Sequence, residues 1–246
     1  EIGVLSTVGK FEVLVRKRPK VMIVSTGDEL VAVNENPEDY QIRRSNVWTL
    51  VSLLQREGIF AKSAHIVDDK KALKEKIASF LAEFDVLMFS GAVSKGKFDF
   101  LPEVLADLGV EKKFHSVKQR PGKPFWFGKK GTKTVFAFPG NPVSTFVGCA
   151  KYFIPWYKKS IGQDVSKIKM AVLAKDFSFK PNLHYFLNVS IQEDANGTRL
   201  ASPVIGNGSG DLANLVNCDG FLELPETKEH FYKGESYPLI IYRNLN

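Results

Sequence analysis

The sequence predicts an α/β protein in which a three-layer domain with a mostly parallel sheet is followed by a small β-rich domain. Two observations lead to this prediction. From Lys20 onward, short apolar runs typical of strands alternate with segments whose apolar residues repeat at helical spacing. Such alternation is typical of parallel sheets covered by helices on both faces. After about Lys167 the helical spacing gives way to short β-rich runs separated by Gly, Pro, Asn and Asp.

The elements of the first domain follow from periodicity and length. The expected strands are 21–25, a run that closes at Val67, and 86–89, and the expected helices are 45–57, 70–84, 100–108 and 142–159, the last one punctuated by Pro155. Parallel sheets bind ligands beyond the carboxyl ends of their strands. The loops that follow these strands are therefore the first place to look for a site.

The second domain is expected to be a compact antiparallel unit, either a small barrel or a sandwich. Its expected strands are 171–172, 187–191, 200–204, 221–224 and 237–242, and residues 160–167 are the expected linker.

Composition narrows the class of protein. The chain has 246 residues, of which 44% are hydrophobic and 25% charged, as in globular proteins. The net charge of +7 implies mild attraction to anions and does not by itself indicate a nucleic-acid partner. Two cysteines and no membrane-spanning run favour a reduced, cytoplasmic setting without a membrane partner. Because the chain begins with Glu1 and residues 2–8 resemble the tail of a preceding element, we expect a fragment of a longer protein.

Three loops carry the residue types that bind anions or metals. The first is Ser25-Thr26-Gly27-Asp28-Glu29, in which glycine permits close backbone approach and the carboxylates offer oxygen ligands. An ordinary turn is the alternative, because Ser, Gly and Asp favour turns.

The second loop, residues 90–99, carries Gly91 and Gly96 before the expected start of a helix, where a phosphate could sit. It ends on Asp99, which is a candidate Mg²⁺ ligand or helix cap. Its spacing matches neither a Walker A loop nor G-x-G-x-x-G.

The third loop pairs two Pro-Gly segments. Arg120 and Lys123 flank Pro121-Gly122 and suit phosphate or an oxyanion. In residues 138–144, Asn141 followed by Pro142 is typical of a helix cap and first helical residue. A turn and a cap would explain each half alone, but packing alone does not account for all three loops together.

The ordered motifs resemble the MoeA and gephyrin E-domain family of molybdopterin molybdenumtransferases. They are STGDEL (25–30), QIRxSN (41–46), a VxDD-like site (66–69), SGxVSxGxxD (90–99), PGKP (121–124) and PGNPVS (139–144), and residues 206–212 resemble the family's C-terminal β-barrel domain. The resemblance implies an exit segment from absent N-terminal domains at 1–19, a molybdopterin-binding α/β domain of the MogA/MoaB kind at 20–165 and a β-barrel domain at 166–246.

The resemblance also implies an activity. Molybdate is placed on adenylylated molybdopterin, AMP is released, and Mg²⁺ is required. Glu29, Asp68 and Asp99 would surround Mg²⁺, and Arg120 and Lys123 would balance molybdate and phosphate charge. The residues expected to hold the pterin and phosphates are Ser25, Thr26, Gly27, Asn46, Ser90, Gly91, Ser94, Gly96, Pro139, Gly140, Asn141, Pro142, Ser144 and, from the second domain, Ser209. A homodimer, contacts with other enzymes of molybdenum cofactor biosynthesis and little activity in this fragment alone are further expectations.

Some positions depart from the family pattern. Arg44 stands where the family usually has Asp, Ala92 stands where it has a second Gly, and Arg120 stands where it has Lys. A further lysine of the family maps onto Ser116, and Lys118 is a candidate substitute for it. One alternative is the related molybdopterin adenylyltransferase of the MogA type, which usually has GGTG where this chain has SGAV and which lacks a β-rich tail. The other is a non-catalytic dimerising or binding module, against which the three retained acids argue.

Overall fold

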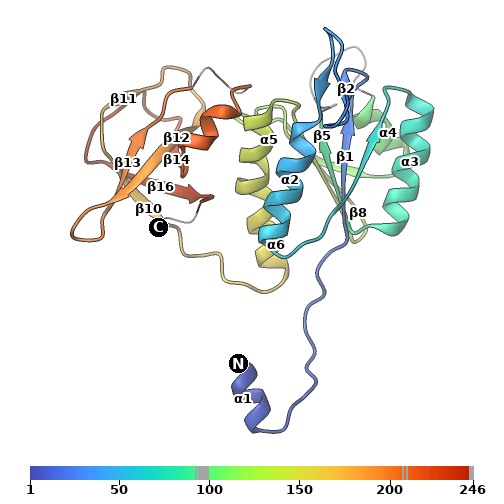
Figure 1. The fold of residues 1–246 in the computed structure, drawn as a ribbon, viewed down its shortest axis with the longest axis horizontal. Coiled ribbons are helices and arrows are strands. Elements are labelled where there is room, and N and C mark those ends of the chain that lie inside the picture. The colour runs from blue at the N-terminus through green and yellow to red at the C-terminus, as the bar shows by residue number, and fades with distance from the viewer. Residues whose placement is uncertain (92, 94–99, 207, 209, 244–246) are drawn as a thin grey trace.

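The computed structural model shows two packed units and an N-terminal arm (Figure 1). It describes residues 1–91, 93, 100–206, 208 and 210–243.

The first unit is built on a six-stranded sheet with the order β4-β1-β5-β9-β8-β6. Its strands are β1 (Val21–Thr26), β4 (Lys62–Ile66), β5 (Val86–Ser90), β6 (Glu111–His115), β8 (Trp126–Lys130) and β9 (Lys133–Phe138). Strands β4, β1, β5 and β9 run parallel, whereas β8 and β6 are antiparallel additions at one edge. The predicted mostly parallel sheet is confirmed, but its parallel strand β9 and its antiparallel edge lie outside the strands that the sequence pattern predicts.

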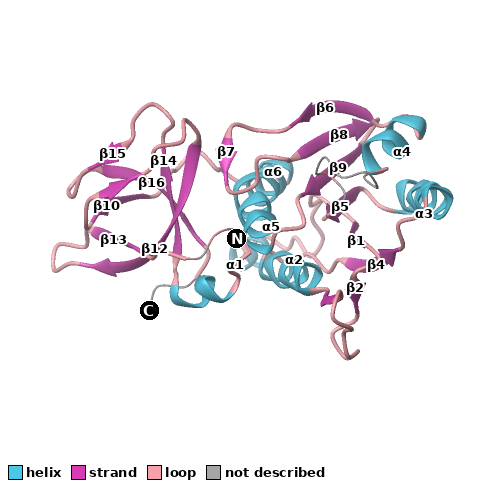
Figure 2. Cartoon of the chain, turned by 90° about the horizontal axis from the view of Figure 1, so that it is seen from above, coloured by secondary structure: helices cyan, strands magenta, loops and turns pink. Residues whose placement is uncertain are grey.

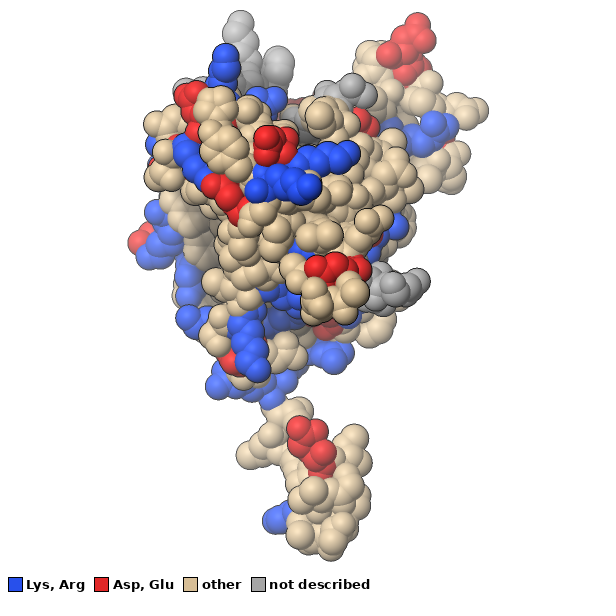
Figure 3. Space-filling view, turned by 90° about the vertical axis from the view of Figure 1, so that its left-hand side faces the viewer, with Lys and Arg blue, Asp and Glu red and all other residues tan. Residues whose placement is uncertain are grey.

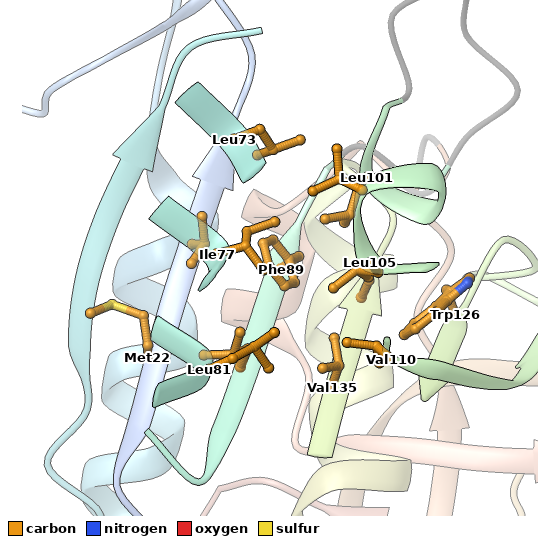
Figure 4. Close-up of a cluster of buried hydrophobic side chains, with 14 of the residues drawn as sticks. Met22, Leu73, Ile77, Leu81, Phe89, Leu101, Leu105, Val110, Trp126 and Val135 are labelled. Atoms are coloured by element: carbon orange, nitrogen blue, oxygen red, sulfur yellow. The ribbon is translucent and has the colours of Figure 1, made fainter. Parts of the chain in front are cut away.

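Helices cover both faces of this sheet (Figure 2). On one face lie α2 (Ser45–Arg56), α5 (Pro142–Gly148) and α6 (Ile154–Ser160), and on the other lie α3 (Lys70–Glu83) and α4 (Leu101–Asp107). The β1 strand is buried at every position, because its side chains alternate between two cores. Figure 4 shows the core under α3 and α4, where Leu73, Ile77 and Leu81 repeat at helical spacing and face Phe89 of β5. The predicted three-layer arrangement is confirmed.

The second unit is a closed barrel of five strands in the order β13-β10-β16-β14-β12, in which β12 also pairs with β13. Its strands are β10 (Met170–Leu173), β12 (His184–Glu193), β13 (Arg199–Pro203), β14 (Gly220–Leu224) and β16 (Ser236–Ile241), and η2 (Ala213–Asn217) is a short 3₁₀ helix. Every predicted run lies on one of these strands or ends beside it. The barrel is not wholly antiparallel, because β10 and β13 pair in parallel. Two small pairs, β2 (Leu30–Val31) with β3 (Ile42–Arg43) and β11 (Phe177–Ser178) with β15 (His230–Phe231), complete the strands.

The helical run 142–160 belongs to the first unit and packs against the barrel. The structure makes it continuous but inserts a π-helical turn, η1 (Cys149–Phe153), directly before α6. Pro155 explains why the regular α-helical ladder fails there, since it has no N–H to donate. A shared apolar core packs Val147 of α5 against Phe221 of β14 and Tyr242.

Polar contacts add to this interface. Strand β7 (Gln119–Arg120) of the first unit pairs in parallel with β12 of the barrel. Lys151 of η1 forms an ion pair with the buried carboxylate of Glu223, with Nζ 2.6 and 2.7 Å from its two oxygens. Nε2 of His184 lies 3.5 Å from the same carboxylate. The two units therefore form one packed body.

The N-terminal arm carries α1 (Ile2–Thr7) and stands away from the body (Figure 3). Its apolar side chains, including Phe11 and Leu14, are exposed. Arg16 and Arg18 tie the end of the arm to the body by donating to the carbonyls of Ser160 and Gly58. No helix among the described residues is long and apolar enough to cross a membrane.

Candidate functional site

The three predicted loops meet at one edge of the sheet. Strand register places Ser25 of β1 opposite Ser90 of β5, and Ser90 opposite Phe138 of β9. The loops that follow these residues therefore leave the sheet side by side, as the carboxyl ends of adjacent parallel strands must. The Gly91 N–H donates to the carbonyl of Phe138 (3.0 Å), which joins the second loop to the third.

A cavity of about 450 Å³ opens where these loops meet. The predicted residues that line it are Ser25, Thr26, Glu29, Asn46, Ser90, Gly91, Pro139, Gly140, Asn141 and Pro142. The walls combine hydroxyl, amide and charged side chains with apolar residues, so a ligand could bind there through both polar groups and van der Waals contact. The structure thus brings together residues of all three loops that were predicted to bind a ligand.

Asn46 ties the cavity walls together. From the start of α2, its Nδ2 donates to Ser90 Oγ (2.8 Å) and to the carbonyl of Gly140 (2.7 Å). Its Oδ1 is buried without a hydrogen-bond partner among the described residues. A buried amide oxygen without a partner costs free energy, so it offers an acceptor to a ligand in the cavity.

Glycine is required at Gly91. The backbone there has φ 101°, a region that L side chains rarely adopt, and an added Cβ would lie 3.3 Å from the carbonyl oxygen of Thr26. A side chain at this position would be strained by the positive φ and would also require the first loop to shift by a few tenths of an ångström. Thr145 Oγ1 fixes the third loop by donating to the carbonyl of Pro139 (2.7 Å).

An acidic corner lies beside the cavity. Asp28 Oδ1 accepts a hydrogen bond from the backbone N–H of Asp68 (3.0 Å), which joins the loops after β1 and β4. Burial and the neighbouring carboxylates Asp28 and Glu29 raise the pKa of Asp68. The first loop was expected to offer the Asp28 carboxylate as an oxygen ligand, but the metal set implied by the resemblance named only Glu29, Asp68 and Asp99.

A histidine also lies at this edge. Register places His65 of β4 beside Ser25, and Ser25 Oγ lies 3.0 Å from His65 Nδ1. Burial, followed by the charge of Arg44, lowers the pKa of His65, which favours the neutral imidazole. Sequence reasoning missed this residue, and its only signal was a polar side chain near the end of a strand.

A second cavity, of about 550 Å³, lies between the two units. Arg120, Lys123 and Ser144 line it from the first unit, and Tyr185 and Asn188 line it from the barrel. The two cavities share the lining residues Pro124, Pro139 and Asn141. The predicted cationic residues therefore adjoin the first cavity rather than line it.

Both cations face the second cavity without an ion-pair partner in the described part of the chain. The Arg120 guanidinium carbon lies 5.7 Å from the ring centre of Phe179, which stacks on Tyr185 with the ring centres 4.1 Å apart. Cation–π contact holds the guanidinium in place while leaving its N–H groups available to an anion. The barrel thus helps to position a cation of the cavity.

Five positions singled out in the sequence lie outside the described residues, namely Ala92, Ser94, Gly96, Asp99 and Ser209. Within the described ranges, no group of three or more His, Cys, Asp or Glu side chains is arranged to hold a metal ion. The predicted Mg²⁺ ligand set thus includes one residue, Asp99, whose position the structure leaves open.

Known proteins match this architecture. The family described as a probable molybdopterin binding domain matches residues 22–159, and the family described as the MoeA C-terminal region (domain IV) matches residues 170–242. A molybdopterin molybdenumtransferase from Synechocystis sp. is 39% identical over 96% of this chain and 59% of its own length. A molybdopterin molybdenumtransferase from Staphylococcus epidermidis is 30% identical over 98% of this chain and 58% of its own length.

A solved structure agrees. The molybdopterin biosynthesis MoeA protein from Pyrococcus horikosii superimposes with a TM-score of 0.81 at 30% identity, over 99% of this chain and 59% of that one. Fold and family matches thus place the chain among α/β proteins of the probable molybdopterin binding domain family. The chain belongs to the MoeA and gephyrin E-domain family, as its motifs predicted. It spans a little under three fifths of the length of the Synechocystis and Staphylococcus relatives.

Proposed function

We propose that this chain carries the reaction site for molybdenum insertion into molybdopterin. Adenylyl-molybdopterin and molybdate would be the substrates, and Mo-molybdopterin and AMP the products. The phosphoanhydride bond breaks, a water oxygen adds to phosphorus, and AMP leaves. Similarity to proteins named molybdopterin molybdenumtransferase supports the reaction class.

One observation carries the assignment to this site. The first cavity, which hydroxyls and glycine backbone line in part, and the second cavity, which Arg120 and Lys123 line, share a wall that includes Pro139 and Asn141. A ligand with phosphate groups in the first cavity would thus lie next to an oxyanion held by Arg120, Lys123 and Ser144 in the second. This adjacency is what transfer of molybdate to a phosphorylated substrate requires.

The acidic corner fits Mg²⁺ by its donor chemistry. Carboxylate oxygens are the ligands that Mg²⁺ prefers, and a cation would relieve the repulsion from Asp28 and Glu29 that, after burial, raises the pKa of Asp68. We assign Glu29 and Asp68 to the ion, with Asp99 as the third expected acid. When bound, Mg²⁺ would neutralise phosphate charge during bond breakage. Asp28 keeps the loop after β4 in place through its hydrogen bond to the Asp68 N–H.

The barrel favours insertion over the adenylyltransferase alternative. Tyr185 and Asn188 of the barrel line the cationic cavity, so this cavity depends on a unit that the single-domain adenylyltransferases lack. We further propose a homodimer, a cytoplasmic location and contacts with other enzymes of molybdenum cofactor biosynthesis. Light scattering of the purified chain tests the dimer directly.

The test of function is AMP release from adenylyl-molybdopterin, followed by chromatography with protein in excess over substrate. A single turnover remains measurable even if the chain alone is slow. We expect release that depends on both molybdate and Mg²⁺ and that is lost in Lys123→Ala. AMP release that is unchanged without molybdate would contradict insertion, and consumption of ATP by the chain with molybdopterin would instead support the adenylyltransferase.

A further inference from the structure

Arg44 lines the first cavity, and neither the metal site nor the oxyanion site proposed above uses it. It immediately precedes α2 and shares the wall with Ser25 and Ser90. Its backbone N–H donates to the carbonyl of Val31 (3.1 Å), so the base of the side chain is anchored.

The guanidinium of Arg44 is not committed to a protein partner. Among the described residues it takes part in no ion pair and donates no hydrogen bond. The adjacent Arg43 differs, because its Nε donates to the carbonyl of Val33 (3.1 Å). A half-buried arginine with five unused donors on a cavity wall is poised for a ligand that accepts several hydrogen bonds.

Positive charge at this wall is reinforced by its surroundings. The first turn of α2, which is fully described, contains no acidic residue, and no side chain caps its N–H groups. The charge of Arg44 also reaches the neighbouring strand end, since it contributes to the lowered pKa of His65. The opposing charge on the cavity wall comes from Glu29.

We propose that Arg44 is a phosphate-binding residue of this cavity, with its guanidinium donating two parallel hydrogen bonds to the oxygens of a phosphate or diphosphate group. Planar guanidinium matches two phosphate oxygens, whereas lysine offers only a point charge. The identity of the ligand rests on the proposed function, in which the phosphates belong to adenylyl-molybdopterin. The binding of a bare diphosphate by Arg44 does not depend on that function.

The resemblance puts Asp at this position in related proteins, so Arg44 inverts the charge at this wall. Arg44→Asp therefore tests the chain-specific part of the proposal, and Arg44→Lys separates bidentate contact from charge. The matched control is Arg18→Gln, which removes the same charge at the amino end of β1, where Arg18 donates to the carbonyl of Gly58.

The experiment is isothermal titration of the chain with inorganic pyrophosphate in EDTA, so that no metal contributes. We expect Arg44→Gln to weaken binding about 10- to 100-fold, as loss of charge-assisted hydrogen bonds implies. Arg44→Asp should bind more weakly still, Arg44→Lys should fall between wild type and Arg44→Gln, and Arg18→Gln should bind like wild type. Circular dichroism verifies that each variant is folded.

Two results would overturn the proposal. The first is binding by Arg44→Gln that equals that of wild type, and the second is an equal loss in Arg44→Gln and Arg18→Gln, which would indicate general attraction to a basic protein. Pyrophosphate binding that depends on Arg44, without molybdate-dependent AMP release, would leave this inference standing and remove the proposed function. The reverse pattern would remove only the role of Arg44.

Discussion

Substitution of Glu223 tests how much the ion pair at the interface between the two units stabilises the fold. The Glu223 side chain is 10% exposed and pairs with Lys151, whose side chain is 33% exposed. Removing one partner of a buried ion pair costs about 3–5 kcal/mol. Because water still reaches Lys151, we expect Glu223→Gln to lower the free energy of unfolding by less, about 2–3 kcal/mol at pH 7. For a chain of this size that is roughly 5–10 °C in the unfolding midpoint.

The pH dependence of this effect has a definite sign. Burial would raise the pKa of Glu223, but the neighbouring His184 and Lys151 outweigh it and the pKa is lowered. A carboxyl whose pKa is lower in the folded state stabilises the fold above its ordinary pKa. The advantage of wild type over Glu223→Gln should therefore be full at pH 7 and disappear as the pH falls through the lowered pKa.

Urea denaturation, followed by fluorescence at several pH values, measures both quantities. The matched control is the double variant Lys151→Met with Glu223→Leu, which removes both charges and should unfold within about 1 kcal/mol of wild type. A loss below about 0.5 kcal/mol in Glu223→Gln, or a loss that does not shrink in acid, would refute the reasoning, because the pair would then be no better than an exposed one.

Two further predictions concern the cleft itself. Asp68→Asn should raise the midpoint of thermal unfolding at pH 7 and abolish stabilisation by Mg²⁺. Burial and the neighbours Asp28 and Glu29 raise the pKa of Asp68, so its charge lowers the stability of the fold once the pH exceeds that pKa. An equal Mg²⁺-induced rise of the unfolding midpoint in wild type and Asp68→Asn would count against the assigned metal site. Gly91→Ala should lower the free energy of unfolding by about 1–3 kcal/mol because of its φ of 101° and the nearby backbone. Gly131→Ala, at φ 56° with open space around it, should cost less, and an equal loss in urea denaturation would contradict the crowding argument.

Periodicity predicted the helices of the first domain and the strands β1, β4 and β5, and it missed β9, β8 and β6 of the same sheet. The helices near 45–57 and 70–84 were recognisable because their apolar residues share one face that the sheet buries. Strand β6 escaped because all of its residues are exposed, which leaves no burial pattern to read. The parallel pairing of β10 with β13 could not be read from sequence either, since pairing depends on how the barrel closes.

In the site, too, the local motifs were predictable from sequence and the long-range contacts were not. Glycine-rich and Pro-Gly loops were visible as motifs, and the parallel sheet brought them together as expected. His65 was invisible because its proximity to Ser25 depends on β4 lying next to β1. The role of the barrel was likewise hidden, since Phe179 reaches Arg120 only through packing between the units. Local sequence encodes local geometry, whereas these contacts depend on long-range register.

The proposed function requires that the site formed by the two cavities releases AMP from adenylyl-molybdopterin as molybdate is taken up. The most direct measurement is single-turnover AMP release by the wild-type chain and by Asp99→Ala, each with and without molybdate. We expect AMP from wild type only when molybdate and Mg²⁺ are present, and none from Asp99→Ala. AMP release by Asp99→Ala equal to wild type would remove that acid from the reaction, and release that ignores molybdate would contradict insertion.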